Sequence, residues 1–217
     1  MKNLIHFRKI GISLCLVALF GAVGAKESKK EEGAPYPAKQ ILIVGLHDNV
    51  KSNYFYNGMI AEETGMQADS IDAAYNRIIA ENIAAASPKG AVRFIPATSK
   101  QIGGQVLNEI KVNGESAESY ADLSAVPAVE WQHVLEQAGA DYLLILNQHY
   151  LKWQDQPLRT LFHIVSYTLV DKEKKEICRG NNYFTCMNLE GPDKLRKISR
   201  KSSSKIASAI VKTLDAE

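Results

Sequence analysis

The fold is decided by residues 139–186, GADYLLILNQHYLKWQDQPLRTLFHIVSYTLVDKEKKEICRGNNYFTC. This stretch holds three long runs of mostly apolar, β-branched and aromatic residues, separated by the short polar segments QDQP and DKEKK. Consecutive strands joined by short polar turns are typical of an antiparallel meander. The sequence therefore predicts three neighbouring antiparallel strands, over residues 140–153, 158–170 and 176–186.

The segments before the meander alternate between strand and helix patterns. Short apolar runs predict strands at residues 40–46 (QILIVGL) and 91–97 (AVRFIPA). Residues 69–87 repeat isoleucine at helical spacing behind Asp69 and Ser70, either of which can cap a helix amino terminus. This pattern predicts a helix between the two strands.

The remaining segments predict two more helices and two loops. One helix starts near Pro127 and ends at Gly139, and the last helix covers residues 191–215. Residues 47–68 predict a loop, and residues 98–125 predict a short helix followed by a surface loop. The apolar stripe of the helix after Pro127 is expected to comprise Val129, Val134, Leu135 and Ala138.

This order of elements predicts an α/β (α+β) fold. We expect a mixed sheet of about five strands with a C-terminal antiparallel three-strand meander, covered by three or more helices. Residues 40–217 should form a single domain. Its core is expected to contain Ile41, Ile43, Ile79, Ile83, Phe94, Leu144, Leu146 and Ile210.

The amino terminus has the pattern of a secretory signal peptide. Basic residues precede an apolar stretch at residues 10–20, and Val23-Gly24-Ala25 supplies the small residues that signal peptidase accepts. We expect cleavage after Ala25, a flexible tether over residues 26–39, and a periplasmic or secreted mature chain with no transmembrane segment. The alternative is a lipoprotein anchored through Cys15, but the preceding leucine is larger than such an anchor requires.

Removal of residues 1–25 takes the formal charge from +2 to −1, because that segment carries three basic and no acidic residues. The charge therefore gives no reason to expect nucleic-acid binding. Cys178 and Cys186 remain, and a disulfide between them would require the chain to fold back at residues 179–182. The sequence leaves that bond open, and the absence of a CxxC or HxxxH pair argues against zinc.

The first meander strand changes character halfway. After the apolar residues 143–146, it mixes polar and apolar side chains over residues 147–153. Strict alternation places His149 on the face of Leu143, and we interpret the change as the strand leaving a helix-covered core. The alternative pairs His149 with His163 on the neighbouring strand as the beginning of a metal site, although no third ligand lies near them in the sequence.

The loop over residues 47–67 holds the candidate site residues. His47 and Asp48 follow the first strand, where open α/β sheets often bind ligands, but no nucleophile motif accompanies them. Tyr54-Phe55-Tyr56 cannot all point inward, and exposed aromatic residues anchor many interfaces. We therefore expect partner contact there; the alternative is that two of the three rings fold back over the sheet edge.

The last predicted helix carries a run of basic residues away from its apolar side. Such a run is either a surface for an anionic partner or the solvated side of an amphipathic helix. These residues are Lys194, Arg196, Lys197, Arg200, Lys201 and Lys205.

Several of these segments together resemble a group of envelope-assembly proteins. The features are ILIVGL, the Ala/Ile-rich helix, VRFIPA, the step AGADYLLIL and the hairpin LVDKEKKEI. This arrangement is similar to the amino-terminal domain of TolB, to LpoB and to CsgG, over about residues 40–98 and 126–214. The resemblance implies a periplasmic, non-catalytic domain that docks other envelope proteins. It implies no catalytic residues and no cofactor.

Two hypotheses of function follow. The first is an exported, non-catalytic protein-interaction module of the bacterial cell envelope with an envelope protein as partner. The alternative is an exported small-ligand binder or metal-dependent hydrolase that uses the His47 region and the His149/His163 strands.

Overall fold

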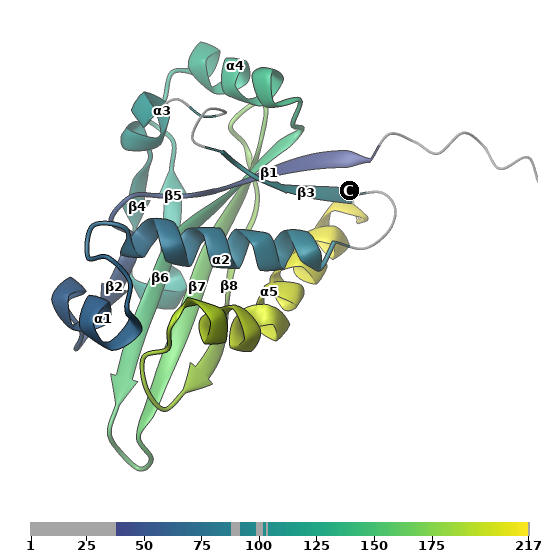
Figure 1. The fold of residues 1–217 in the computed structure, drawn as a ribbon. Coiled ribbons are helices and arrows are strands. Elements are labelled where there is room, and N and C mark those ends of the chain that lie inside the picture. Colours follow the sequence, from purple (N-terminus) through teal and green to yellow (C-terminus); the bar gives the residue numbers. More distant parts are fainter. Residues whose placement is uncertain (1–37, 88–91, 99–101, 103, 217) are drawn as a thin grey trace, which may run out of the picture. The chain divides into compact units, whose positions relative to one another are not determined.

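The computed structural model describes residues 38–87, 92–98, 102 and 104–216, and it confirms the predicted fold class (Figure 1). Its main sheet has six strands in the order β3-β1-β6-β7-β8, and β2 pairs with β6 beyond the end of β1. The strands are β1 (Lys39–Gly45), β2 (Val50–Ser52), β3 (Val92–Pro96), β6 (Tyr142–Gln154), β7 (Thr160–Asp171) and β8 (Glu176–Cys186).

Both kinds of strand pairing occur in this sheet. β1 pairs in parallel with β3 and with β6, whereas β6, β7 and β8 form the predicted antiparallel meander. Parallel neighbours require crossover connections, and α2 (Ile71–Ala85) and α4 (Ala128–Ala138) lie within them. The sequence predicts a sheet of about five strands, and β2 is the sixth strand, which the sequence does not predict.

Helices cover both faces of the sheet, so the protein has two apolar cores. The α2/α5 core lies under α1 (Asn57–Thr64), α2 and α5 (Pro192–Leu214), and Figure 1 shows α2 and α5 crossing the meander on the same side. The α4 core lies under α3 (Gly104–Glu109), α4 and a two-stranded sheet, β4 (Lys111–Asn113) and β5 (Tyr120–Asp122). All eight residues expected in the core are buried, and all belong to the α2/α5 core.

A β-bulge in β6 overturns the predicted alternation of its side chains. The register between β6 and β7 shifts between Leu146 and Gln148. Before the shift, Leu144 and Leu146 face the α2/α5 core; after it, Leu151 faces that core. A bulge inserts one residue and so exchanges the two faces of everything that follows. His149 therefore lies on the face opposite to that of Leu143. Its ring packs edge-on against Tyr75 of α2, with centroids 4.5 Å apart, which is the contact that shows this placement.

The polar half of β6 does not leave the core where the sequence predicts. Asn147, Gln148 and His149 are all buried, and exposure begins only at Lys152. The amide of Asn147 donates to Ser119 O at 3.0 Å and to Thr168 Oγ1 at 3.0 Å. Gln148 Oε1 accepts a hydrogen bond from the amide of Ser116 at 2.7 Å. These bonds allow the Asn147 amide nitrogen and the Gln148 oxygen to stay buried, while Asn147 Oδ1 is buried without a hydrogen-bond partner among the described residues.

Two stretches are more ordered than the sequence predicts, although the short helix expected within residues 98–125 is present as α3. Residues 47–68 contain β2 and α1, and burial of Ile60 and Met66 in the α2/α5 core holds α1 in place. Residues 98–125 contain α3, β4, the short 3-10 helix η1 (Ser116–Glu118) and β5. The β5 hairpin is tied to the meander by hydrogen bonds from Ala121 N to Thr168 Oγ1, at 3.1 Å, and between the Ser119 and Ser166 hydroxyls, at 2.5 Å.

Two local predictions about helices were wrong. Val129 is 78% exposed, and Trp131 instead fills the α4 core, where its indole donates to Asp171 O at 2.8 Å. Burial of the larger indole removes more apolar area from water, which favours this rotation of the helix. Ser70 does occupy the N-cap position of α2, but its hydroxyl donates backwards to Gln67 O and caps nothing.

Cys178 and Cys186 both lie on β8 and are not joined to each other by a disulfide. No helix in residues 38–87 and 104–216 is long and apolar enough to span a membrane. The predicted signal peptide and most of the predicted tether lie outside the described residues, and β1 begins at Lys39.

Candidate functional site

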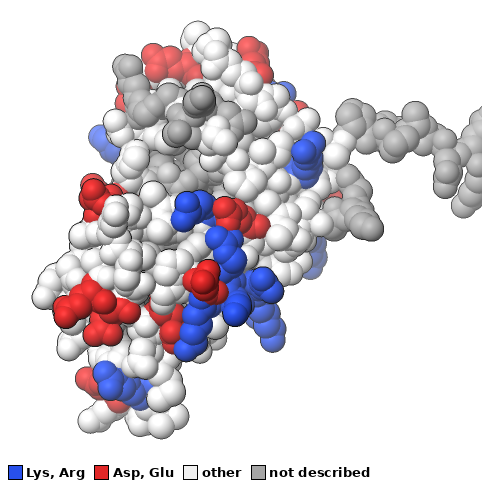
Figure 2. All heavy atoms as spheres, in the orientation of Figure 1, with Lys and Arg blue, Asp and Glu red and all other residues white. Residues whose placement is uncertain are grey.

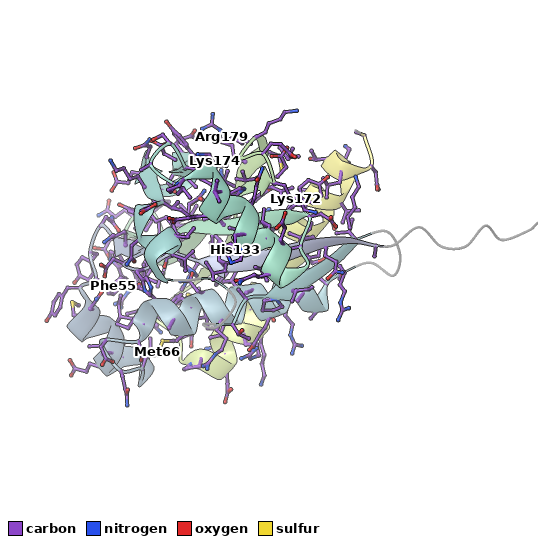
Figure 3. All side chains as sticks on the ribbon, turned by 90° about the horizontal axis from the view of Figure 1, so that it is seen from above. Phe55, Met66, His133, Lys172, Lys174 and Arg179 are labelled. Atoms are coloured by element: carbon purple, nitrogen blue, oxygen red, sulfur yellow. The ribbon has the colours of Figure 1, made fainter. Side chains whose placement is uncertain are left out.

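The candidate aromatic residues follow β2 and lie against the far end of β6. Tyr54, Phe55 and Tyr56 connect β2 with α1, and the structure brings Trp153 of β6 to them. We call these four residues the aromatic surface. Figure 3 shows Phe55 at the opposite side of the molecule from Lys172, which follows β7.

Side-chain hydrogen bonds from Ser52 and Asn53 fix this loop on the sheet. Ser52 Oγ donates to Leu151 O at 2.7 Å and accepts from the amides of Tyr54 and Phe55, at 3.0 and 2.9 Å. Asn53 Nδ2 donates to Trp153 O at 3.1 Å, and Trp153 N donates to Asn53 Oδ1 at 2.7 Å. Asn53 thus takes the place of a backbone partner and extends the β2–β6 pairing by one position.

The rings of the aromatic surface contact one another in favourable geometries. Tyr54 stacks on Trp153 with centroids 5.8 Å apart and an interplanar angle of 24°. Phe55 meets both rings edge-on, at 5.0 Å from Tyr54 and 5.6 Å from Trp153. The guanidinium of Arg159, at the start of the returning strand, lies 4.8 Å from the Trp153 centroid in a cation–π contact.

Much of this aromatic area remains in contact with solvent. Tyr54 is 58% exposed and Tyr56 is 68% exposed, whereas Phe55 is half-buried and packs against the α2/α5 core. The Tyr56 ring lies over Gly58, where a Cβ would approach it to 2.9 Å. One ring of the three therefore anchors the loop, and two tyrosines present their faces outward.

His47 and Asp48 lie apart from the aromatic surface. His47 lines a cavity of about 310 Å³ at the carboxyl ends of β1 and β3, together with Arg77 of α2, and no residue of the aromatic surface lines it. Asp48 is held in the left-handed region (φ 50°), and its amide donates to Asp72 Oδ2 at 2.8 Å. The structure therefore places His47 at this cavity, whereas the sequence grouped it with Tyr54, Phe55 and Tyr56 in one loop.

The space between the ends of β1 and β6 is filled by a pair of asparagines. Asn49 Nδ2 donates to Asn76 Oδ1 at 2.9 Å and to Leu146 O at 3.0 Å, and Asn76 Nδ2 donates to Leu46 O at 3.0 Å. A side chain at Gly45 would collide with that of Asn76, which explains the glycine. These contacts close the crevice where a ligand could otherwise enter from the β6 side.

The two strand histidines meet, but not in the register that the sequence suggested. His149 pairs with Val165 and His163 pairs with Leu151, so the imidazoles are diagonal neighbours on one face. His149 Nε2 lies 3.1 Å from His163 Nδ1, and His163 Nε2 lies 3.2 Å from Cys186 Sγ. The sequence did not predict a contact between Cys186 and the histidines. Side chains alternate between the two faces of β8, and Cys186 lies on the face that carries the histidines.

This buried chain of polar groups is neutral. Burial, together with the neighbouring His163, holds the pKa of His149 well below its usual range, and burial lowers the pKa of His163 to about 3. Burial and the nearby Glu190 raise the pKa of Cys186 to about 11, so its thiol stays protonated. Burial also raises the pKa of Tyr75, whose hydroxyl has no hydrogen-bond partner within the described residues.

The protonation states leave this chain without an activated nucleophile. The Cys186 thiol is 2.9 Å from Asn188 O, a geometry consistent with donation to that carbonyl and acceptance from His163. A thiol rather than a thiolate is a poor nucleophile and a poor metal ligand. The described part of the chain contains no group of three or more His, Cys, Asp or Glu side chains that could hold a metal ion.

No protein-family model matches the sequence, and no curated protein matches it significantly. Among solved structures, the PelC dodecamer from Paraburkholderia phytofirmans is similar, with 12% identity and a TM-score of 0.39, over 81% of this chain and 92% of that one. Lipoprotein GNA1162 from Neisseria meningitidis has 17% identity and a TM-score of 0.37, over 83% of this chain and all of that one.

The C-terminal domain of LpoB from Salmonella enterica is also similar to this chain. It has 10% identity and a TM-score of 0.31, over 70% of this chain and 85% of that one. LpoB is one of the three proteins that the sequence resembles. Likeness at this level assigns no function, so the functional argument depends on the residues of this chain.

Proposed function

We propose that this chain is an exported, non-catalytic protein-interaction module of the bacterial cell envelope, and that its partner binds the aromatic surface. The observation that carries the proposal is the exposed ring of Tyr54, which stacks on the half-buried Trp153 and belongs to a loop fixed by Ser52 and Asn53. Tyr, Trp and Arg dominate the binding energy of protein interfaces. Export is inferred from the signal-peptide pattern of residues 1–25.

The anchoring of the loop supports binding because it lowers the entropy lost on association. The backbone amides of Tyr54 and Phe55 are bonded to Ser52, and the rings already contact one another. A rigid ring that is ordered before binding costs less to immobilise in a complex than a mobile one. Arg159 over Trp153 adds a cation at the rim, where it can favour a partner of complementary charge.

A double substitution, Tyr54→Ser/Tyr56→Ser, tests this proposal. A photoactivated crosslinker placed next to the aromatic surface in living cells should capture a specific envelope protein, and the purified partner should bind the isolated chain. We expect the double substitution to weaken that binding by about tenfold or more, with an unchanged melting temperature. The control is Val129→Ser, which removes an exposed apolar side chain from α4. Equal binding by wild type and the double variant would contradict the proposal.

The cavity at His47 supports a second candidate function, a binder of small ligands. Its position at the carboxyl ends of two parallel strands is where open α/β sheets bind ligands, and His47 and Arg77 are the titratable groups among its lining residues. A thermal-shift screen with small anions and amphiphiles would test it. Stabilisation that His47→Ala and Arg77→Ala abolish would favour this function; the buried, neutral histidines of the meander give no comparable support for a hydrolase.

A further inference from the structure

The two edges of the main sheet differ in how well they are protected against pairing with another chain. β3 forms one edge, has five residues and ends at Pro96, which has no N–H to donate. β8 forms the other edge and has eleven residues without proline. Within the described residues, β8 has no strand neighbour besides β7 and no loop hydrogen-bonded to its backbone. Such an edge offers a row of backbone groups to an added strand.

Helix α5 runs alongside this edge and presents lysines next to it. The hydroxyl of Ser202 donates to Asn182 Oδ1 of β8 at 3.0 Å, which fixes the orientation of the helix. At 100° per residue, Lys194, Lys201 and Lys205 fall in one row on the side of Ser202 that is turned away from α2. Arg196 marks the other side, because it pairs with Glu81 of α2.

The lysine row carries uncompensated positive charge. Lys194 is paired with Glu190 at 2.8 Å, but Lys201 and Lys205 are exposed and make no ion pair with any described residue. Figure 2 shows Lys and Arg side chains gathered over α5. The only acidic residue within α5 itself is Asp193, in its first turn. The field beside the β8 edge is therefore positive.

The other face of β8 offers an aromatic contact at Tyr183, next to exposed polar residues that include Arg179. Tyr183 is 60% exposed and lies 6.1 Å from the ring of Phe162 on β7. Because side chains alternate along a strand, a segment added to β8 would direct every second side chain toward α5 and the others toward Tyr183. The first set would meet lysines, and the second set would meet Tyr183 among the polar side chains of Arg179, Asn181 and Thr185.

We propose that the β8 edge, Lys201 and Lys205 together form a docking site that binds an extended acidic segment of a partner protein by strand addition. The backbone of β8 supplies hydrogen bonds to the segment, and the two lysines select carboxylates on one of its faces. The other face of the segment, which is apolar, packs beside Tyr183. This site is separate from the aromatic surface and does not depend on the function proposed for that surface.

A designed peptide tests this proposal on the purified exported chain. The probe is a capped twelve-residue peptide of alternating Glu and Val, with two controls: the same peptide N-methylated at alternate residues, and a peptide of alternating Lys and Val. We expect the Glu-Val peptide to bind and to shift amide NMR signals along β8. N-methylation should weaken binding by about tenfold or more, because it removes the N–H groups that strand addition uses. The Lys-Val peptide should not bind.

Charge-reversed variants locate the site. Lys201→Glu/Lys205→Glu should weaken binding of the Glu-Val peptide by about tenfold or more, whereas the matched control Lys197→Glu/Arg200→Glu should change it by less than about threefold. The proposal would be overturned if the N-methylated peptide bound as tightly as the unmodified Glu-Val peptide. It would also be overturned if both charge-reversed variants lost the same affinity, because binding would then depend only on non-specific charge attraction. Absence of binding by the Glu-Val peptide would also overturn it. Tyr54→Ser/Tyr56→Ser should bind this peptide like the wild type, so the two proposals fail independently.

Discussion

Two clusters on the same strand reverse the usual distribution of residue types. At His149, β6 buries an imidazole that contacts a second imidazole and a thiol, while at Trp153 a half-buried indole stacks on the exposed ring of Tyr54. The two positions are four residues apart and lie on the same face. The difference is what covers them: α2 lies over His149, whereas the loop before α1 and the side chain of Arg159 lie beside Trp153. Residue type alone therefore does not tell a buried cluster from a surface cluster here.

The largest effect on stability is expected in the apolar half of β6, and it serves as the reference for the effects at the two clusters. Leu144 is fully buried in the α2/α5 core, so Leu144→Ala should lower the free energy of unfolding by about 2–5 kcal/mol. Chemical denaturation measures this value. A loss within experimental error would show that β6 is not the central strand of that core.

The buried cluster should make the protein sensitive to acid. The folded-state pKa values of His149 and His163 lie below the ordinary value of 6.5, so the unfolded chain binds more protons. Stability is therefore complete above about pH 6.5 and falls as the pH drops toward 3, by up to about 1.4 kcal/mol per pH unit for each histidine. Denaturation curves between pH 7.5 and 4.5 measure the slope.

Substitution of the histidines isolates their share of that slope. His149→Asn/His163→Asn should flatten the dependence of stability on pH, whatever it does to stability at pH 7.5. His133→Asn is the control for loss of an imidazole outside the buried cluster, because His133 is exposed on α4 (Figure 3). A slope that is the same in the double variant and in the wild type would mean that the imidazoles are not buried as described.

A smaller effect is expected from the anchor beneath the exposed cluster. Asn53→Ala removes both hydrogen bonds to the backbone of Trp153 and should cost about 1 kcal/mol. Hydrogen exchange of the Tyr54 and Phe55 amides should become faster, because these amides depend on the same turn. Unchanged exchange would show that the loop does not need this anchor.

The smallest effect on stability is expected at the exposed rings themselves. Tyr54→Ser/Tyr56→Ser should change the free energy of unfolding by less than about 0.5 kcal/mol, as substitutions of exposed side chains usually do. Thermal and chemical denaturation together test this. A loss above about 2 kcal/mol would mean that the tyrosines belong to the core rather than to an interaction surface.

The apolar pattern of the sequence was sufficient for much of the fold. Isoleucines at helical spacing in α2, and apolar runs at β1 and β3, predicted the elements and the eight core residues that the structure buries. The polar turns predicted the meander, because a turn of four or five residues joins antiparallel strands only. These features depend on local sequence, so they could be predicted from it.

Features that depend on contacts between distant segments could not be predicted. The bulge at Asn147 is stabilised by partners near residues 119 and 168, and a single asparagine within a strand pattern does not by itself predict a bulge. The buried stripe of α4, by contrast, could have been predicted from local spacing, because Trp131, Val134, Leu135 and Ala138 stand at i, i+3, i+4 and i+7, and Val129 does not fit that spacing. Trp153 joined the candidate site only when the pairing of β2 with β6 was known.

The positions of the two tryptophans make intrinsic fluorescence a reporter of two separate events. Trp131 is fully buried in the α4 core, and Trp153 lies in the aromatic surface beside Arg159. The sequence contains two tryptophans in all, so Trp131→Phe and Trp153→Phe each leave one emitting group. Emission from Trp131 then follows unfolding, and its quenching by a soluble collision quencher should be weak. Emission from Trp153 should be quenched more strongly in the free chain than in a complex, because a partner that covers the aromatic surface shields the indole. Fluorescence of the two single-tryptophan variants can therefore distinguish binding from unfolding.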